Sequence, residues 1–142
     1  MSEYIYLSSD RPLNVRNTRE FIFSSNFDEV ERAFFSFSPH FQHKEYQACT
    51  YSGELPDKKK MQKLQKGGSI NQATTNKLFD IIVNQFNEAN CETLELLFAY
   101  NGYENEKISE KKLIPFAELS PKDLYFQHMR LLTIKKNASQ NN

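Results

Sequence analysis

The stretch Thr75–Tyr100, TNKLFDIIVNQFNEANCETLELLFAY, carries the two strongest structural signals in the chain. Its first part has apolar residues at helical spacing, which predicts a helix from Thr75, as N-cap, to about Ala89. Its second part, Thr93–Tyr100, has large apolar residues at every second position and further apolar residues between them. That pattern is typical of a central strand that is covered on both faces. The stretch therefore predicts a helix packed on a sheet.

The N-terminal half adds predicted strands on either side of a second helix. Aromatic and β-branched residues predict strands at Tyr4–Leu7 and Glu20–Ser24. Apolar residues at helical spacing after Ser25 predict a helix that ends by residue 38, because Pro39 follows. Looser alternation predicts a long strand over Phe41–Tyr51.

The C-terminal part adds strands and turns. Asn101-Gly102 is a strong turn signal and predicts that Thr93–Tyr100 continues into a long hairpin. Leu113–Leu119 is a strand candidate that Pro115 would place at an edge of the sheet. Ser120–Asp123 has the cap and proline of a helical turn, and a last strand is predicted to about Lys136.

These elements together predict an α+β fold. We expect a single mixed or mainly antiparallel sheet of about five to six strands, with two main helices packed on one face. Residues 1–136 are expected to form one domain, since 142 residues is a common domain length, and the polar residues 137–142 are expected to be a disordered tail.

The composition excludes several classes of function. With four glycines in 142 residues, the chain has no phosphate-cradling loop, dinucleotide fingerprint or nucleophile elbow. No stretch is apolar and long enough to cross a membrane, and the N-terminus lacks the pattern of a signal peptide. Two cysteines, Cys49 and Cys91, imply no disulfide framework. We therefore expect a cytoplasmic protein without a cofactor.

Charge is balanced overall but unevenly placed. The formal net charge is zero, yet residues 58–66 hold five lysines and no acid, while residues 88–110 hold six glutamates and one lysine. Asp57 is expected to cap a short surface helix over Lys58–Lys66, whose only apolar stripe is Met61 and Leu64. Its lysines are the candidate binding residues for an acidic partner: Lys58, Lys59, Lys60, Lys63 and Lys66.

One further cluster resembles a metal site or pocket. On a strand, His43, Glu45 and Cys49 would share a face, and His128 is a possible fourth member from elsewhere in the chain. A structural zinc site needs four ligands at defined spacing, and His40 would lie on the opposite face, so no metal is assigned. The glutamates after Asn101-Gly102 are expected to be solvated rather than catalytic.

These observations favour a small, non-catalytic, cytosolic binding protein that acts through a protein–protein surface. A regulator of the inhibitor or immunity type fits best, and the richness in lysine, asparagine and phenylalanine suggests an AT-rich, bacterial gene. The first alternative is a nucleic-acid-binding protein that uses segment 58–66. The second is an enzyme or small-ligand-binding module with an aromatic pocket at the sheet edge, using His43 or His128.

Overall fold

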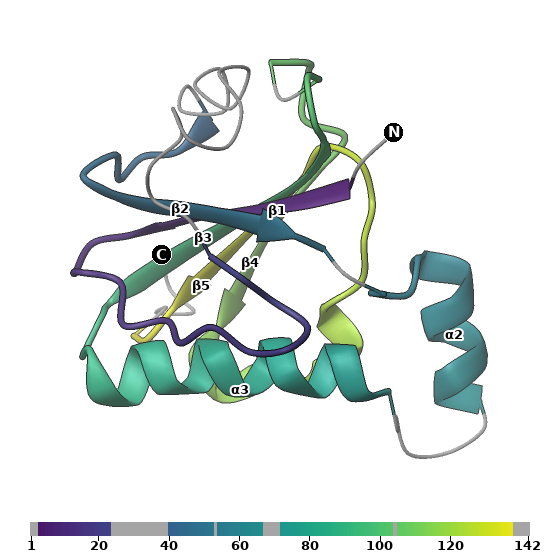
Figure 1. Ribbon diagram of the computed structural model, residues 1–142, viewed down its shortest axis with the longest axis horizontal. Helices are drawn as coiled ribbons and strands as arrows, with labels where there is room; N and C mark the ends of the chain where they lie inside the picture. The colour runs from purple at the N-terminus through teal and green to yellow at the C-terminus, as the bar shows by residue number, and fades with distance from the viewer. Residues whose placement is uncertain (1–2, 24–39, 53, 67–71, 104, 138–142) are drawn as a thin grey trace.

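The computed structural model describes residues 3–23, 40–52, 54–66, 72–103 and 105–137, and the fold is drawn in Figure 1. In these residues five strands form one sheet with the order β2-β1-β3-β5-β4. The strands are β1 (Glu3–Ser9), β2 (Tyr46–Tyr51), β3 (Thr93–Tyr100), β4 (Glu110–Pro115) and β5 (Arg130–Lys135). Neighbouring strands are antiparallel except for β4 and β5, which are parallel. The predicted α+β class with one mixed, mostly antiparallel sheet is confirmed.

Strand β3 has the predicted bounds and the predicted central position. It pairs with β1 on one side and β5 on the other, and every residue from Thr93 to Ala99 is buried. Leu94, Leu96 and Phe98 belong to the larger core cluster, so they share the face that the sequence indicated.

Helix α3 (Ala73–Glu88) lies across one face of the sheet (Figure 1). Its Leu78, Ile82 and Phe86 are buried in the larger core cluster together with the inward residues of β1, β3 and β5. This packing is the expected arrangement of an amphipathic helix on a sheet.

The predicted cap of α3 is wrong, and its predicted end is confirmed. The helix begins at Ala73, and Gln72 is the N-cap, with its side-chain oxygen accepting a hydrogen bond from the Thr75 amide at 2.6 Å. A glutamine is a rare cap, so Thr75 was the stronger local signal. Asn90 follows the helix with φ of 56°, the left-handed conformation that asparagine tolerates.

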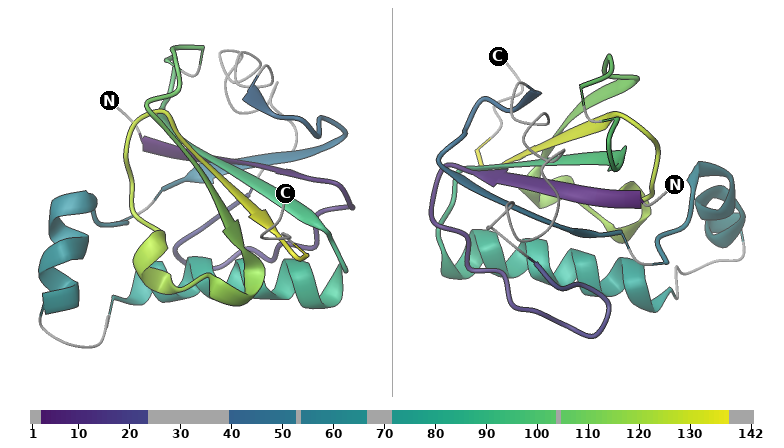
Figure 2. Two further views of the ribbon diagram at one scale, coloured as in Figure 1. Left: turned by 180° about the vertical axis from the view of Figure 1, so that it is seen from behind. Right: turned by 45° about the horizontal axis from the view of Figure 1, so that its top comes forward.

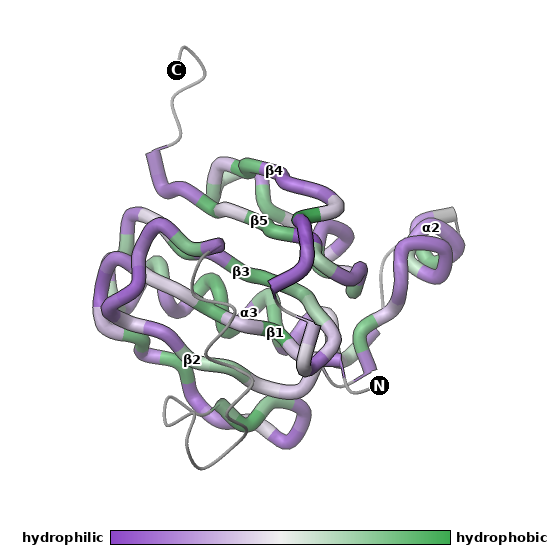
Figure 3. Tube along the Cα trace, turned by 90° about the horizontal axis from the view of Figure 1, so that it is seen from above, coloured by the Kyte–Doolittle hydropathy of each residue, from purple (hydrophilic) through white to green (hydrophobic). Residues whose placement is uncertain are grey.

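The opposite face of the sheet is also apolar. A second cluster gathers Tyr4 and Tyr6 from β1, Cys49 from β2 and Leu97 from β3, and Phe41 packs against them. Figure 1 shows α3 on one face of the sheet, and Figure 3, seen from above, shows β4 and β2 at its two edges.

The turn at Asn101-Gly102 is present, but the predicted hairpin is wrong. Gly102 has φ of 92°, which suits glycine, and the Tyr103 amide donates to the Tyr100 carbonyl at 3.0 Å. The next strand, β4, does not pair with β3, because β5 lies between them. Burial explains this order: β5 is mostly buried, whereas Ile114 is the only buried residue of β4.

Two predicted strands differ from the structure near the N-terminus. Residues 20–23 form no strand, since the amides of Phe21, Ile22 and Phe23 donate to the side chains of Thr18, Thr50 and Asn17 and not to a neighbouring strand. Ser24, the end of that prediction, lies outside the described residues.

The strand predicted over Phe41–Tyr51 begins only at Tyr46. Upstream of it, the amides of Gln42 and His43 each donate to the carboxylate of Glu95 at 3.1 Å. These amides therefore bond to a side chain and form no ladder.

The C-terminal elements are close to the prediction, with shifted bounds. Strand β4 ends at Pro115, earlier than predicted, and the 3-10 turn η2 (Phe116–Glu118) follows it. Its edge position is confirmed. A second 3-10 turn, η3 (Pro121–Asp123), forms at the predicted capping sequence, where Asp123 accepts from the Ser120 amide at 2.9 Å. Strand β5 then ends at Lys135.

The helix predicted after Ser25 and most of the tail predicted at 137–142 lie outside the described residues. Among the residues that the structure describes, no helix has the length and apolar character needed to span a bilayer.

Candidate functional site

Helix α2 (Lys58–Lys66) has the predicted bounds, and its residues are good helix formers. Asp57 is confirmed as its cap, since the side chain accepts from the Lys60 amide at 2.8 Å and the carbonyl accepts from the Met61 amide at 2.9 Å. Met61 is 1% exposed and anchors the helix. Figure 1 shows α2 beside the start of α3, off the end of the sheet.

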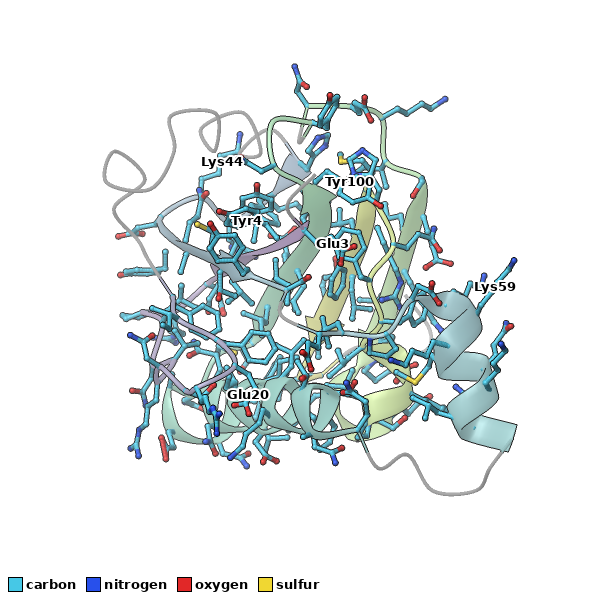
Figure 4. All side chains as sticks on the ribbon, turned by 45° about the vertical axis from the view of Figure 1, so that its right-hand side comes forward. Glu3, Tyr4, Glu20, Lys44, Lys59 and Tyr100 are labelled. Atoms are coloured by element: carbon cyan, nitrogen blue, oxygen red, sulfur yellow. The ribbon has the colours of Figure 1, made fainter. Side chains whose placement is uncertain are left out.

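Four lysines and two glutamines form the exposed described surface of α2. The lysines are Lys58, Lys59, Lys60 and Lys63. None of these four lysines takes part in any of the three ion pairs found among the described residues. Lys59 extends from the outer side of the helix in Figure 4. The cationic charge of α2 is therefore solvated and available to a partner.

A recess of about 200 Å³ lies between α2 and the C-terminal turns. Lys58 lines it from α2, Lys112 from β4 and Lys122 from η3, and Tyr125 forms part of its wall. Asp123 is the one acidic residue in the lining, and one of its oxygens caps η3. We call this hollow the α2 recess. The sequence showed the lysines of α2 but not the two added by distant segments.

A buried arginine lies behind the wall of the α2 recess. Arg130 is fully buried, and its Nε donates to Glu110 Oε1 at 2.6 Å. The guanidinium carbon lies 3.9 Å from the centre of the Tyr125 ring and 5.5 Å from that of Phe98. Such stacking between two rings replaces part of the hydration that the cation loses. The remaining amino group, Nη2, has no hydrogen-bond partner among the described residues.

The arginine also changes its neighbours' proton affinities. Burial alone would raise the pKa of Glu110, but the hydrogen bond and charge of Arg130 outweigh it, so the pKa lies below its ordinary value. Burial raises the pKa of Tyr125, and its hydroxyl donates to Glu110 at 3.2 Å. The sequence reasoning missed this cluster. A single arginine in an apolar strand was the available signal, but its partner Glu110 is found only once β4 is known to lie beside β5.

The structure does not assemble the predicted cluster of His43, Glu45 and Cys49. His43 and Glu45 precede β2, so the expected alternation of faces does not apply to them, while Cys49 is buried against the tyrosines of β1. The described residues contain no group of three or more potential metal ligands.

His128 lies at the other end of β3 and has both ring nitrogens engaged. Its Nδ1 accepts from the Tyr100 amide at 3.1 Å, and its Nε2 lies 2.7 Å from Glu106 Oε1. In the neutral ring the proton must therefore lie on Nε2. The Tyr100 amide bonds to His128, and the Glu95 carboxylate accepts the His43 amide. Tyr100 and Glu95 are five residues apart on β3, which separates them by about 16 Å. The two histidines therefore cannot share a site.

Another hollow, of about 500 Å³, lies at the edge formed by β2. Its lining includes Phe23, Tyr46 and Glu45, and apolar residues of the loop that follows β1. Neither His43 nor His128 lines it. It has the aromatic lining of the predicted edge pocket without the histidines that would give it acid–base chemistry.

Neither cysteine is exposed to solvent, since Cys49 and Cys91 are both buried. Burial, with a smaller contribution from the charge of Asp10, raises the pKa of Cys91 to about 12. This thiol stays protonated at neutral pH and is a poor nucleophile.

Comparisons with protein families, with curated proteins and with solved structures found no match.

Proposed function

We propose that this protein is a non-catalytic binding protein that docks an acidic surface of a partner protein through the lysines of α2. A regulatory role of the inhibitor or immunity type is the corresponding biological class. The observation that carries the proposal is the contrast within α2, where Met61 is buried and the described lysines around it are exposed and outside every described ion pair.

Two groups that could support catalysis are otherwise engaged. His128 has partners on both nitrogens, and burial keeps the Cys91 thiol protonated. A general base needs a free lone pair within reach of a substrate, and a nucleophilic cysteine needs its thiolate. This favours binding over acid–base or thiol chemistry.

A protein partner is favoured over a nucleic acid by two features. Segment 58–66 contains no aromatic residue on which a base would stack. The formal net charge of the whole chain is zero, whereas nucleic-acid-binding domains usually carry a basic excess. An exposed lysine surface on a protein of zero net charge can attract an acidic protein and orient it as it binds.

The test compares two variants with equal changes in net charge. Lys59→Glu with Lys60→Glu reverses charge on α2, whereas Lys44→Glu with Lys107→Glu reverses two exposed lysines elsewhere. Figure 4 shows Lys44 and Lys59 well apart. Immobilised wild type and both variants are used to capture proteins from a lysate of the source organism, once untreated and once treated with nuclease.

We expect an acidic protein that the wild type and the Lys44/Lys107 variant retain equally and that the α2 variant binds about tenfold more weakly, as two lost charge contacts predict. Equal capture by all three proteins would contradict the proposal. Binding that nuclease treatment abolishes would favour the nucleic-acid alternative instead.

A further inference from the structure

Strand β4 has an open edge. It pairs with β5 on one side, and no other described strand pairs with it. Figure 3 shows it as the outermost strand, and the view from behind in Figure 2 shows it in front of the rest of the sheet. Unpaired strand edges offer backbone donors and acceptors to another chain.

The direction of the backbone groups of β4 follows from one hydrogen bond. The Glu110 amide donates to the Met129 carbonyl at 3.4 Å, the bond that the parallel register of Glu110 with Arg130 requires, so the backbone groups of Glu110 face β5. The Ser109 amide, which precedes the strand, reaches the same carbonyl at 2.7 Å. Because the backbone groups of a strand alternate between its two sides, those of Lys112 also face β5, and those of Lys111 and Leu113 face outward. Pro115 has no amide hydrogen and ends the open edge.

A cationic hollow flanks this edge on each face of the sheet. On the face of α3 it is the α2 recess, with Lys112, Lys58 and Lys122. On the opposite face, a hollow of about 170 Å³ is lined by Lys111, Lys135 and other residues that include the half-exposed Leu113. We call it the β4 recess.

The acidic side chains in the two recesses are occupied. In the β4 recess, the buried carboxylate of Glu95 accepts the amides of Gln42 and His43. In the α2 recess, Asp123 caps η3. Each recess has three lysines in its lining and one carboxylate, so the lining keeps a net positive charge on both faces.

We propose that the open edge of β4 binds an extended acidic segment of the partner as an added strand. This rests on the proposed function, which supplies an acidic protein partner. The added strand would bond to the backbone of Lys111 and Leu113, and its side chains would alternate between the α2 recess and the β4 recess. Carboxylates on both faces of the segment match the charge of both recesses.

The same lysines disfavour a second copy of this protein at the edge. Two β4 strands brought together would place Lys111 and Lys112 of both copies close to one another, and like charges across a strand pair are destabilising. The lysines of β4 thus disfavour pairing with the β4 strand of a second copy and favour pairing with an acidic strand.

The test uses an acetylated and amidated decaglutamate peptide with ¹⁵N-labelled protein at pH 7. We expect the amide signals of Lys111 and Leu113 to shift on titration, and their exchange with solvent to slow at least about fivefold when the peptide is bound. Slowed exchange reports the new backbone hydrogen bonds, which charge attraction alone would not form.

Two substitutions of Leu113 separate the contribution of its backbone amide to peptide binding from that of its side chain. Leu113→Pro removes an outward amide that the β5 ladder does not use, and binding should weaken about tenfold. Leu113→Ser removes the apolar side chain but keeps the amide, and binding should stay within about twofold. Circular dichroism and thermal unfolding check that both variants are folded.

The outcomes distinguish this inference from the proposed function. Signal shifts confined to α2 would overturn strand addition and leave the α2 surface as the binding site. No shift at millimolar peptide would also overturn it, while the lysate capture still decides the proposed function. Equal binding of a ten-nucleotide single strand, insensitive to Leu113→Pro, would overturn it in favour of a surface for polyanions in general.

Discussion

Arg130 and the lysines of α2 carry the same charge and lie near the same recess, but the arginine is buried and the described lysines are exposed. Arg130 is fully buried, bonded to Glu110 and stacked on Tyr125. The described α2 lysines are exposed and belong to no described ion pair. A buried cation has to be compensated for the chain to fold, whereas an exposed one costs little. Stability should therefore depend on Arg130, and binding on α2.

The largest expected effect comes from leaving the buried cation without its partner. Glu110→Ala should lower the free energy of unfolding by about 3 kcal/mol, because Arg130 stays buried with an uncompensated charge. Urea unfolding measures the loss. Arg16→Ala is the control, since it removes an exposed pair with Glu88 at 3.7 Å and should cost less than about 0.5 kcal/mol. Similar losses in the two variants would show that burial does not matter here.

A smaller effect is expected from pH. Arg130 holds the pKa of Glu110 below its ordinary value of 4.5 in the folded protein. The unfolded chain therefore binds this proton at higher pH than the folded one, so the contribution is present above about pH 4.5 and is lost as the pH falls through the folded-state value.

Urea unfolding of the wild type and of Glu110→Gln between pH 7 and pH 3 tests this sign. The free energy of unfolding should fall more steeply in the wild type as acid is added, because the variant lacks the titrating carboxyl group. Parallel curves would mean that the Arg130–Glu110 pair adds nothing that depends on protonation.

The smallest effect on stability is expected from α2 itself. Lys59→Glu with Lys60→Glu should change the free energy of unfolding by less than about 0.5 kcal/mol, since neither residue takes part in a described ion pair and acids are favourable in a first helical turn. Thermal unfolding beside the Lys44/Lys107 variant measures it. A loss above about 1 kcal/mol would show that these lysines serve the fold and would weaken the case for binding.

Local signals explain what the sequence predicted well. The bounds of β3 and α2 are those of the prediction, because alternation in Thr93–Tyr100 and the cap at Asp57 each lie within a few residues of the element they define. The predicted end of α3 at about Ala89 and the edge position of β4 indicated by Pro115 also depend on local residues.

The parts that were not predictable depend on distant residues. Nothing within 41–45 reveals that Glu95 takes two of its amides, and nothing in β4 reveals that β5 lies between it and β3. The Arg130–Glu110 pair and the two recesses could not be predicted for the same reason, since each joins segments that the strand order brings together. In the candidate site, the surface position of the α2 lysines could be predicted from the sequence, whereas the presence of Lys112, Lys122 and Arg130 beside them could not.

The strand order also sets a constraint on the timing of folding. In the register of β1 with β3, Tyr4 lies opposite Ala99, so β1 pairs with a strand whose facing residue is made 95 residues later. During synthesis on a ribosome, one edge of β1 stays unpaired until β3 emerges. One edge of β3 then stays unpaired until β5 emerges. Such long-range pairing slows folding and exposes strand edges meanwhile. The period between the synthesis of β1 and that of β5 is therefore when this chain is most vulnerable to aggregation.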